Sequence, residues 1–209
     1  MPLLFGSIYV FISIFNSPTV LVEMNVPNFL TLIRIFSIPV FVVLFYLPFS
    51  WSHTVTAILF ALAAITDWLD GYLARSWDQT SSFGAFLDPV ADKLIVVTAL
   101  VLVVGERNIP FIAIPAAIII GREIVVSALR EWMSELGKRT SVAVSIVGKV
   151  KTFIQMIALV MLLAYQPGDK LIGLVGITLF YLAAALTLWS MVMYLQVAWP
   201  EMKWSGKSE

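Results

Sequence analysis

Four aspartates stand between residues 67 and 92 of a chain whose neighbouring stretches are apolar. Asp67 and Asp70 are three residues apart and Asp88 and Asp92 four apart, so on helices each pair would share one face. Carboxylates are costly to bury unpaired, and inside membrane spans they mark functional sites. Clustered carboxylates need cations between them, and oxygen ligands suit hard ions such as Mg²⁺ or Mn²⁺. The aspartates therefore predict a divalent-metal site.

The residues between the two pairs indicate what a metal would act on. Gly71 and Gly84 have no Cβ and would let a ligand approach the backbone. Arg75 carries a planar guanidinium that fits phosphate oxygens. Acids for metal, an arginine for phosphate and glycines for access together indicate metal-assisted phosphoryl transfer. The simpler alternative is a set of carboxylates held in salt bridges between helices.

The spacing of these residues resembles the signature of the CDP-alcohol phosphatidyltransferases. The matching pattern is Asp67-x-x-Asp70-Gly71-x-x-Ala74-Arg75, then eight residues, then Gly84-x-x-x-Asp88-x-x-x-Asp92. The resemblance implies that the four aspartates hold two Mg²⁺ or Mn²⁺ ions and that Asp92 is also the general base. It implies a CDP-diacylglycerol site formed by Gly71, Ala74, Arg75 and Gly84, with Asn28, Thr31 and Arg34 added from the first helix.

The composition indicates a membrane protein. Hydrophobic residues make up 60% of the 209 residues and charged residues 12%, about half the share in a soluble domain. The mean hydropathy is +0.96. The formal net charge is zero, so no nucleic-acid partner is implied, and the absence of cysteine excludes disulfides and thiolate metal sites.

The apolar runs predict an all-α integral membrane protein, because about 20 apolar residues span a bilayer and the backbone in lipid must be helical. Six transmembrane helices are expected, at roughly 28–47, 53–76, 86–104, 110–135, 142–165 and 169–198. Residues 1–23 are expected to be an N-terminal extension or an interfacial helix, 24–200 the membrane domain, and 201–209 a cytoplasmic tail. Lysine and arginine gather at the end of the helices that carries the aspartates, which places that end in the cytoplasm.

A second polar cluster stands at the same end of the fourth and fifth expected helices. Arg122 and Lys149 are embedded in apolar sequence, and Arg130, Lys138 and Lys151 are close to them along the chain. These five cations predict a site for the phosphate of an acceptor substrate. A solvated helix end with ion pairs is the alternative, especially for Lys138.

The residues around this cluster, together with VPNFLTLIR near residue 30, look like the bacterial phosphatidylglycerophosphate synthases, a branch of the family. That resemblance implies a homodimer in the bacterial inner membrane, active site facing the cytoplasm. It implies transfer of the phosphatidyl group from CDP-diacylglycerol to sn-glycerol 3-phosphate with release of CMP. An inositol phosphate as acceptor is one alternative. The other is a divalent-cation transporter, which would place its acids near the bilayer midplane.

Overall fold

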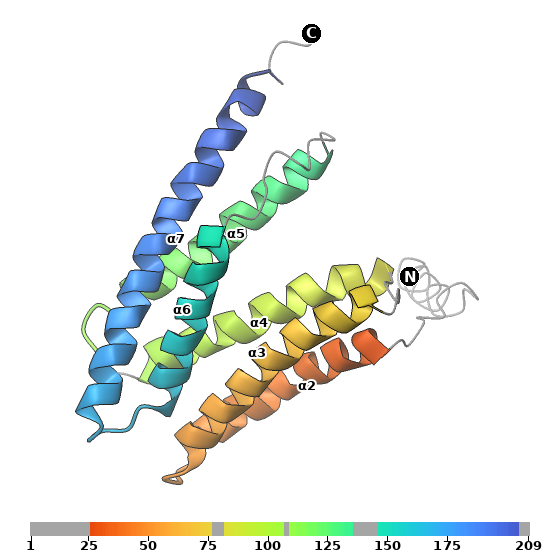
Figure 1. Ribbon diagram of the computed structural model, residues 1–209. Helices are drawn as coiled ribbons and strands as arrows, with labels where there is room; N and C mark the ends of the chain where they lie inside the picture. Colours follow the sequence, from red (N-terminus) through yellow and green to blue (C-terminus); the bar gives the residue numbers. More distant parts are fainter. Residues whose placement is uncertain (1–25, 77–81, 107–108, 136–145, 205–209) are drawn as a thin grey trace, which may run out of the picture.

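Six helices account for nearly all of the residues described by the computed structural model, which are 26–76, 82–106, 109–135 and 146–204 (Figure 1). The helices are α2 (Val26–Tyr46), α3 (Ser52–Ser76), α4 (Ser82–Glu106), α5 (Ala113–Glu135), α6 (Ile146–Ala164) and α7 (Lys170–Trp204). No strand occurs in these ranges. The all-helical prediction is confirmed, and each predicted helix corresponds to an observed one.

Several predicted ends differ from the observed ones by a few residues, and the start of α4 and the end of α7 are two of the largest differences. Helix α4 begins at Ser82, four residues before its predicted start, so Gly84 belongs to the helix. Helix α7 continues to Trp204, six residues beyond the prediction. Both differences arise where an apolar run meets a polar segment, because hydropathy there no longer indicates where the helical hydrogen bonds stop.

Two tight connections at the end opposite the aspartates determine where α5 and α7 begin. Gly168 has φ +147°, which a residue with a Cβ rarely adopts, and α7 starts two residues later. Before α5, Phe111 has φ +62°. The hydroxyl of Tyr181 on α7 donates to the Phe111 carbonyl at 3.1 Å, which ties this connection to α7.

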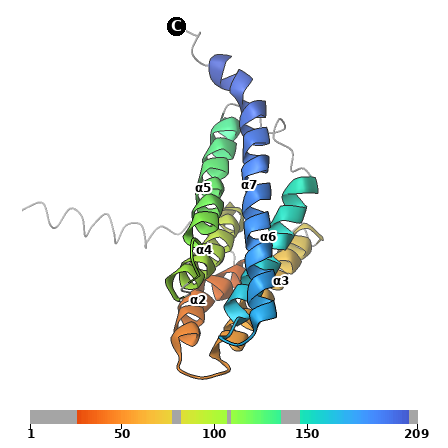
Figure 2. The ribbon, with the colours of Figure 1, turned by 90° about the vertical axis from the view of Figure 1, so that its left-hand side faces the viewer.

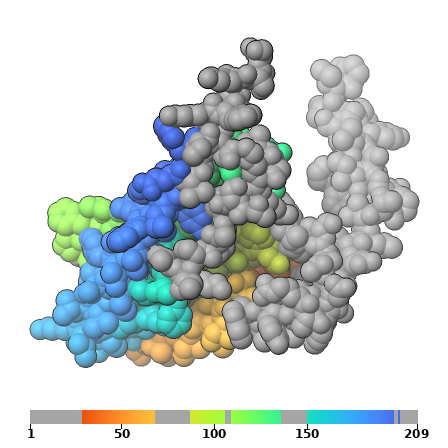
Figure 3. All heavy atoms as spheres, turned by 45° about the horizontal axis from the view of Figure 1, so that its top comes forward, coloured from red at the N-terminus to blue at the C-terminus, as the bar shows by residue number. Residues whose placement is uncertain are grey.

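The helices form two halves that meet along one seam. Helix α2 packs on α3 and α4, while α5 and α6 both pack on α7. The seam is made mainly by α3 against α6, with smaller contacts of α4 to α5 and α6 (Figures 1 and 2). Figure 3 shows α6 between α7 and α3 on the surface. Buried apolar side chains from both halves, among them Phe41, Phe60, Leu159 and Phe180, form one continuous core.

Apolar side chains also cover much of the outside. Phe36 is 73% exposed, Leu171 74% and Trp189 66%. Helices α2 and α7 contain apolar segments long enough to cross a bilayer, Phe29–Tyr46 and Lys170–Gln196. A helix that is apolar around its whole circumference belongs in a large core or in lipid, and the exposed side chains here favour lipid.

Candidate active site

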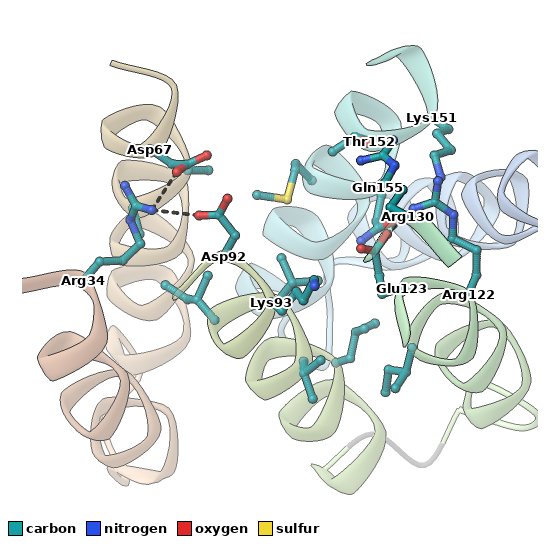
Figure 4. Close-up of a pocket in the computed structure, with 18 of the residues that line it drawn as sticks. Arg34, Asp67, Asp92, Lys93, Arg122, Glu123, Arg130, Lys151, Thr152 and Gln155 are labelled. Carbon is teal, nitrogen blue, oxygen red and sulfur yellow. Dashed lines mark hydrogen bonds and ion pairs between the residues drawn. The ribbon is translucent and has the colours of Figure 1, made fainter. Parts of the chain in front are cut away.

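A cavity of about 310 Å³ lies where the two halves meet, and residues of opposite charge line it (Figure 4). Asp67 of α3 and Asp92 of α4 belong to its lining on one side. Arg122 and Arg130 of α5 and Lys151 of α6 belong to its lining on the other. We call these two groups the acidic wall and the basic wall. Both lie at the same end of the molecule, as the sequence predicted for the two clusters.

The acidic wall is organised around Arg34 of α2. Its Nη1 donates to Oδ1 of Asp67 at 2.6 Å and to Oδ1 of Asp92 at 2.8 Å. The Arg34 side chain is 3% exposed, whereas those of Asp67 and Asp92 are 40% and 44% exposed. The guanidinium therefore lies behind the two carboxylates, which remain accessible from the cavity (Figure 4).

A third aspartate is held from the same helix. The Thr31 hydroxyl donates to Oδ1 of Asp88 at 2.7 Å, and Thr31 is 1% exposed. Thr31 and Arg34 are one turn apart on α2 and therefore share the face that packs on α3 and α4. Helix α2 thus contacts three of the four motif aspartates.

The described residues suit a hard divalent cation in chemistry. Asp67, Asp88 and Asp92 offer only oxygen, and carboxylates of two helices converge on one cationic atom, Nη1 of Arg34. Within the described ranges no three histidine or acidic side chains are close enough to form a metal centre by themselves. The fourth predicted ligand, Asp70, is one turn beyond Asp67 on α3, and its side chain lies outside the described part.

The basic wall contains more cations than it can pair. Nη1 of Arg122 donates to Oε1 of Glu123 at 2.6 Å, which compensates one charge. Lys151 is 2% exposed, and its Nζ has no hydrogen-bond partner among the described residues. The Nε of Arg122 is likewise buried without one. Because a buried cation without a partner is costly, the wall is suited to receive an anion.

Tyr194 of α7 links the two arginines of the basic wall. The guanidinium carbons of Arg122 and Arg130 lie 5.9 and 5.6 Å from the centre of its ring, within the range of cation–π contact. Nη2 of Arg130 also donates to the tyrosine hydroxyl at 3.3 Å. Tyr194 is 8% exposed and belongs to the cavity lining.

The structure brings together Arg34, Asp67, Asp92, Arg122, Arg130 and Lys151 around one cavity. Thr31 and Asp88 are paired with each other beside it. Seven other predicted residues are on the helices, but apart from this their surroundings lie outside the described part: Asn28, Asp70, Gly71, Ala74, Arg75, Gly84 and Lys149. Lys138 lies outside the described residues altogether.

The family model for CDP-alcohol phosphatidyltransferase matches residues 24–193, which include both walls. The chain belongs to the CDP-alcohol phosphatidyltransferase family. A relative from Salmonella typhimurium is 57% identical over 176 residues, covering 84% of this chain and 96% of its own. Others from Pseudomonas fluorescens and Yersinia pestis are 54% and 56% identical, covering 89% and 86% of this chain and 96% and 98% of theirs. All three are named CDP-diacylglycerol–glycerol-3-phosphate 3-phosphatidyltransferase.

Five polar or charged lining residues of this CDP-alcohol phosphatidyltransferase were not among the predicted site residues: Lys93, Glu123, Thr152, Gln155 and Tyr194. Tyr194 is more than 60 residues from Arg130 and stands in an apolar run, so no local spacing connects them. Gln155, 6% exposed, is one turn after Lys151. That i, i+4 spacing of two polar residues in an apolar helix is a signal that could have revealed Gln155.

Proposed function

We propose that this chain transfers the phosphatidyl group of CDP-diacylglycerol to sn-glycerol 3-phosphate and releases CMP. Family membership supports transfer of a phosphatidyl group from a CDP-alcohol. The names of the relatives, whose sequences the chain covers almost completely, support glycerol 3-phosphate as the acceptor. The reaction also requires two anionic substrates to meet.

The observation that carries the proposal is a single cavity with an acidic wall and a basic wall. The acidic wall, with the motif residues beyond it on α3, is assigned to the pyrophosphate of CDP-diacylglycerol. The basic wall is assigned to the phosphate of the acceptor, because Lys151 and the Arg122 Nε have hydrogen-bonding capacity to offer. An acceptor without a phosphate would leave these buried cations uncompensated.

In the proposed reaction, an acceptor hydroxyl oxygen attacks the phosphorus atom that carries the diacylglycerol. A new P–O bond forms, the P–O bond to CMP breaks, and CMP leaves with the bonding electron pair. Asp92 accepts the hydroxyl proton, because its carboxylate is accessible from the cavity and lies on the wall opposite the acceptor's cations. Asp67 on α3 and Asp88 on α4 are kept in position by hydrogen bonds from α2.

Asp67, Asp70, Asp88 and Asp92 are the proposed ligands of two Mg²⁺ or Mn²⁺ ions. When bound, such ions would neutralise the pyrophosphate and the charge that develops on departing CMP. The protein's own part is to bring carboxylates from two helices together, which Arg34 does for Asp67 and Asp92.

We place the chain in the bacterial inner membrane as a six-span homodimer with both walls facing the cytoplasm. The exposed apolar side chains of α2 and α7 support contact with lipid. The orientation can be tested by cysteine labelling, since the chain has no native cysteine. Asp169→Cys, in the exposed turn before α7, should react with an impermeant thiol reagent from outside, and Ser134→Cys should not. The reverse pattern would contradict the orientation.

Release of CMP from purified protein tests the reaction directly. The protein, in detergent with CDP-diacylglycerol and Mg²⁺, is given glycerol 3-phosphate, an inositol phosphate or plain glycerol in separate assays. Of the three acceptors, we expect only glycerol 3-phosphate to give rapid CMP release. A preference for the inositol phosphate would show that the proposed acceptor is wrong but that the reaction class is right. Equal rates with glycerol and glycerol 3-phosphate would contradict the role of the basic wall.

A further inference from the structure

Helix α2 supplies two buried polar side chains that end on carboxylates of other helices. Thr31 is 1% exposed and Arg34 4% exposed, although both are on a largely apolar helix. Their three hydrogen bonds, 2.6 to 2.8 Å long, go to Asp67 on α3 and to Asp88 and Asp92 on α4. Burying a polar group costs free energy because it loses its hydrogen bonds to water, so such groups are normally hydrogen-bonded to protein partners.

We propose that Thr31 and Arg34 are positioning residues that fix the aspartate carboxylates in the orientation that binds a divalent cation. The inference rests on the metal-dependent reaction proposed above and goes beyond it, because it gives α2 a role in cation affinity. The sequence alone suggested that both residues contact CDP-diacylglycerol. In the structure both residues hydrogen-bond to the motif carboxylates.

The direction of approach supports this role. Arg34 is almost fully buried, while Asp67 and Asp92 are about two-fifths exposed. The arginine therefore holds one oxygen of each carboxylate from behind and leaves the accessible side of each facing the cavity. Partners that hold metal-binding carboxylates in this way typically contribute 10- to 100-fold to metal affinity.

Charge supplies a second reason. Two carboxylates that share a site repel each other, and each would rotate away from the other if no positive charge lay between them. Arg34 places one positive charge on the oxygens of both. Thr31 is neutral, so at Asp88 the effect is orientation alone. Both residues therefore orient a carboxylate, but only Arg34 also adds a positive charge.

Mn²⁺ binding to the purified full chain tests the proposal, because it requires neither substrates nor turnover. Thr31→Val keeps the shape of the side chain and removes the hydrogen bond to Asp88. Thr56→Val is the matched control: Thr56 is also buried, but its hydroxyl donates to the Ser52 carbonyl of its own helix at 2.8 Å. Electron paramagnetic resonance of free Mn²⁺ measures the affinity.

We expect Thr31→Val to bind Mn²⁺ roughly 10- to 100-fold more weakly than the wild type, and Thr56→Val to bind like the wild type. Arg34→Lys, which keeps the charge on a shorter, non-planar side chain, should also weaken binding. If Thr31→Val does not fold, Arg34→Lys alone decides the outcome, since it preserves the buried charge balance.

Several results would overturn the inference: unchanged Mn²⁺ affinity in the α2 variants, equal weakening by Thr56→Val, or no Mn²⁺ binding by the wild type. A higher KM for CDP-diacylglycerol with unchanged Mn²⁺ affinity would return both residues to the nucleotide site. Failure of the proposed reaction would be seen separately, as absence of CMP release by a wild-type protein that still binds Mn²⁺.

Discussion

The two walls of the cavity balance their charges in different ways. On the acidic wall a buried arginine bonds to both Asp67 and Asp92, so the protein itself supplies a cation for its anions. On the basic wall only Arg122 has a carboxylate partner, while Lys151 has no hydrogen-bond partner within the described ranges. The ring of Tyr194 also contacts both guanidinium groups of the basic wall, but it carries no charge that could balance theirs.

This difference indicates what each wall is built to do. Carboxylates held rigidly by a buried partner keep one geometry, which suits metal binding and proton transfer. Cations without enough anions are stabilised when an anionic ligand arrives, which suits substrate binding. The comparison therefore predicts that substitutions on the acidic wall change turnover and that those on the basic wall change acceptor affinity.

The largest effect is expected for Asp92→Asn. The amide keeps the shape of the side chain but cannot accept the proton or carry the charge, so kcat should fall at least about a hundredfold. CMP release at saturating concentrations of both substrates measures this. The control is Asp169→Asn, an exposed acid at the opposite end of the molecule, which should keep normal turnover. Near-normal turnover by Asp92→Asn would remove Asp92 from the acidic wall's chemistry.

A smaller and more selective effect is expected for Lys151→Met, which removes the unpartnered amine of the basic wall. A hydrogen bond to a charged group is worth about 1.5–3 kcal/mol, so kcat/KM for glycerol 3-phosphate should fall roughly 10- to 150-fold. Arg122→Gln should behave in the same way. The KM for CDP-diacylglycerol should change far less, because that substrate is assigned to the other wall.

Lys170→Met provides the matched control for charge, since Lys170 is exposed at the start of α7, away from the cavity. It should leave both KM values unchanged. Equal losses toward both substrates in Lys151→Met would mean that the lysine supports the fold of this end, and the contrast between the walls would then be lost.

The smallest effect is expected at Tyr194, which acts through its neighbours. Tyr194→Leu removes the cation–π contact with the arginines, worth about 0.5–2 kcal/mol in all, so the KM for glycerol 3-phosphate should rise about 2- to 30-fold with little change in kcat. Tyr194→Phe keeps the ring and loses only the hydrogen bond from Arg130, so its KM should lie closer to that of the wild type. A lower kcat in Tyr194→Phe with normal KM would contradict a positioning role.

The number and approximate positions of the helices could be predicted from the sequence, because long apolar runs allow only helices in lipid and short polar connections separate them. The arrangement of the helices could not be predicted in this way. Nothing in the sequence shows that α3 packs on α6, and this contact forms much of the seam at which the cavity lies.

The site was predictable where residue types cluster along the chain. The grouping of Asp67 with Asp92, and of Arg122 with Arg130 and Lys151, is seen in the cavity lining. What spacing alone could not give was the pairing across helices: Arg34 with two aspartates, Thr31 with Asp88, and Tyr194 with two arginines. Each of these depends on which faces of distant helices meet, and α2 and α7 are otherwise read only as apolar segments. The roles assigned to the site residues stay predictions.

The buried Lys151 amine has a consequence for the end of the catalytic cycle. In the proposed reaction the acceptor's phosphate is not consumed but is carried into the lipid product, so the same amine that attracts the substrate also retains the product. We therefore expect the finished lipid to leave slowly, and accumulated product to inhibit the enzyme in competition with glycerol 3-phosphate. A substitution that weakens phosphate binding by Lys151 would therefore speed release of the lipid product while it weakens binding of glycerol 3-phosphate.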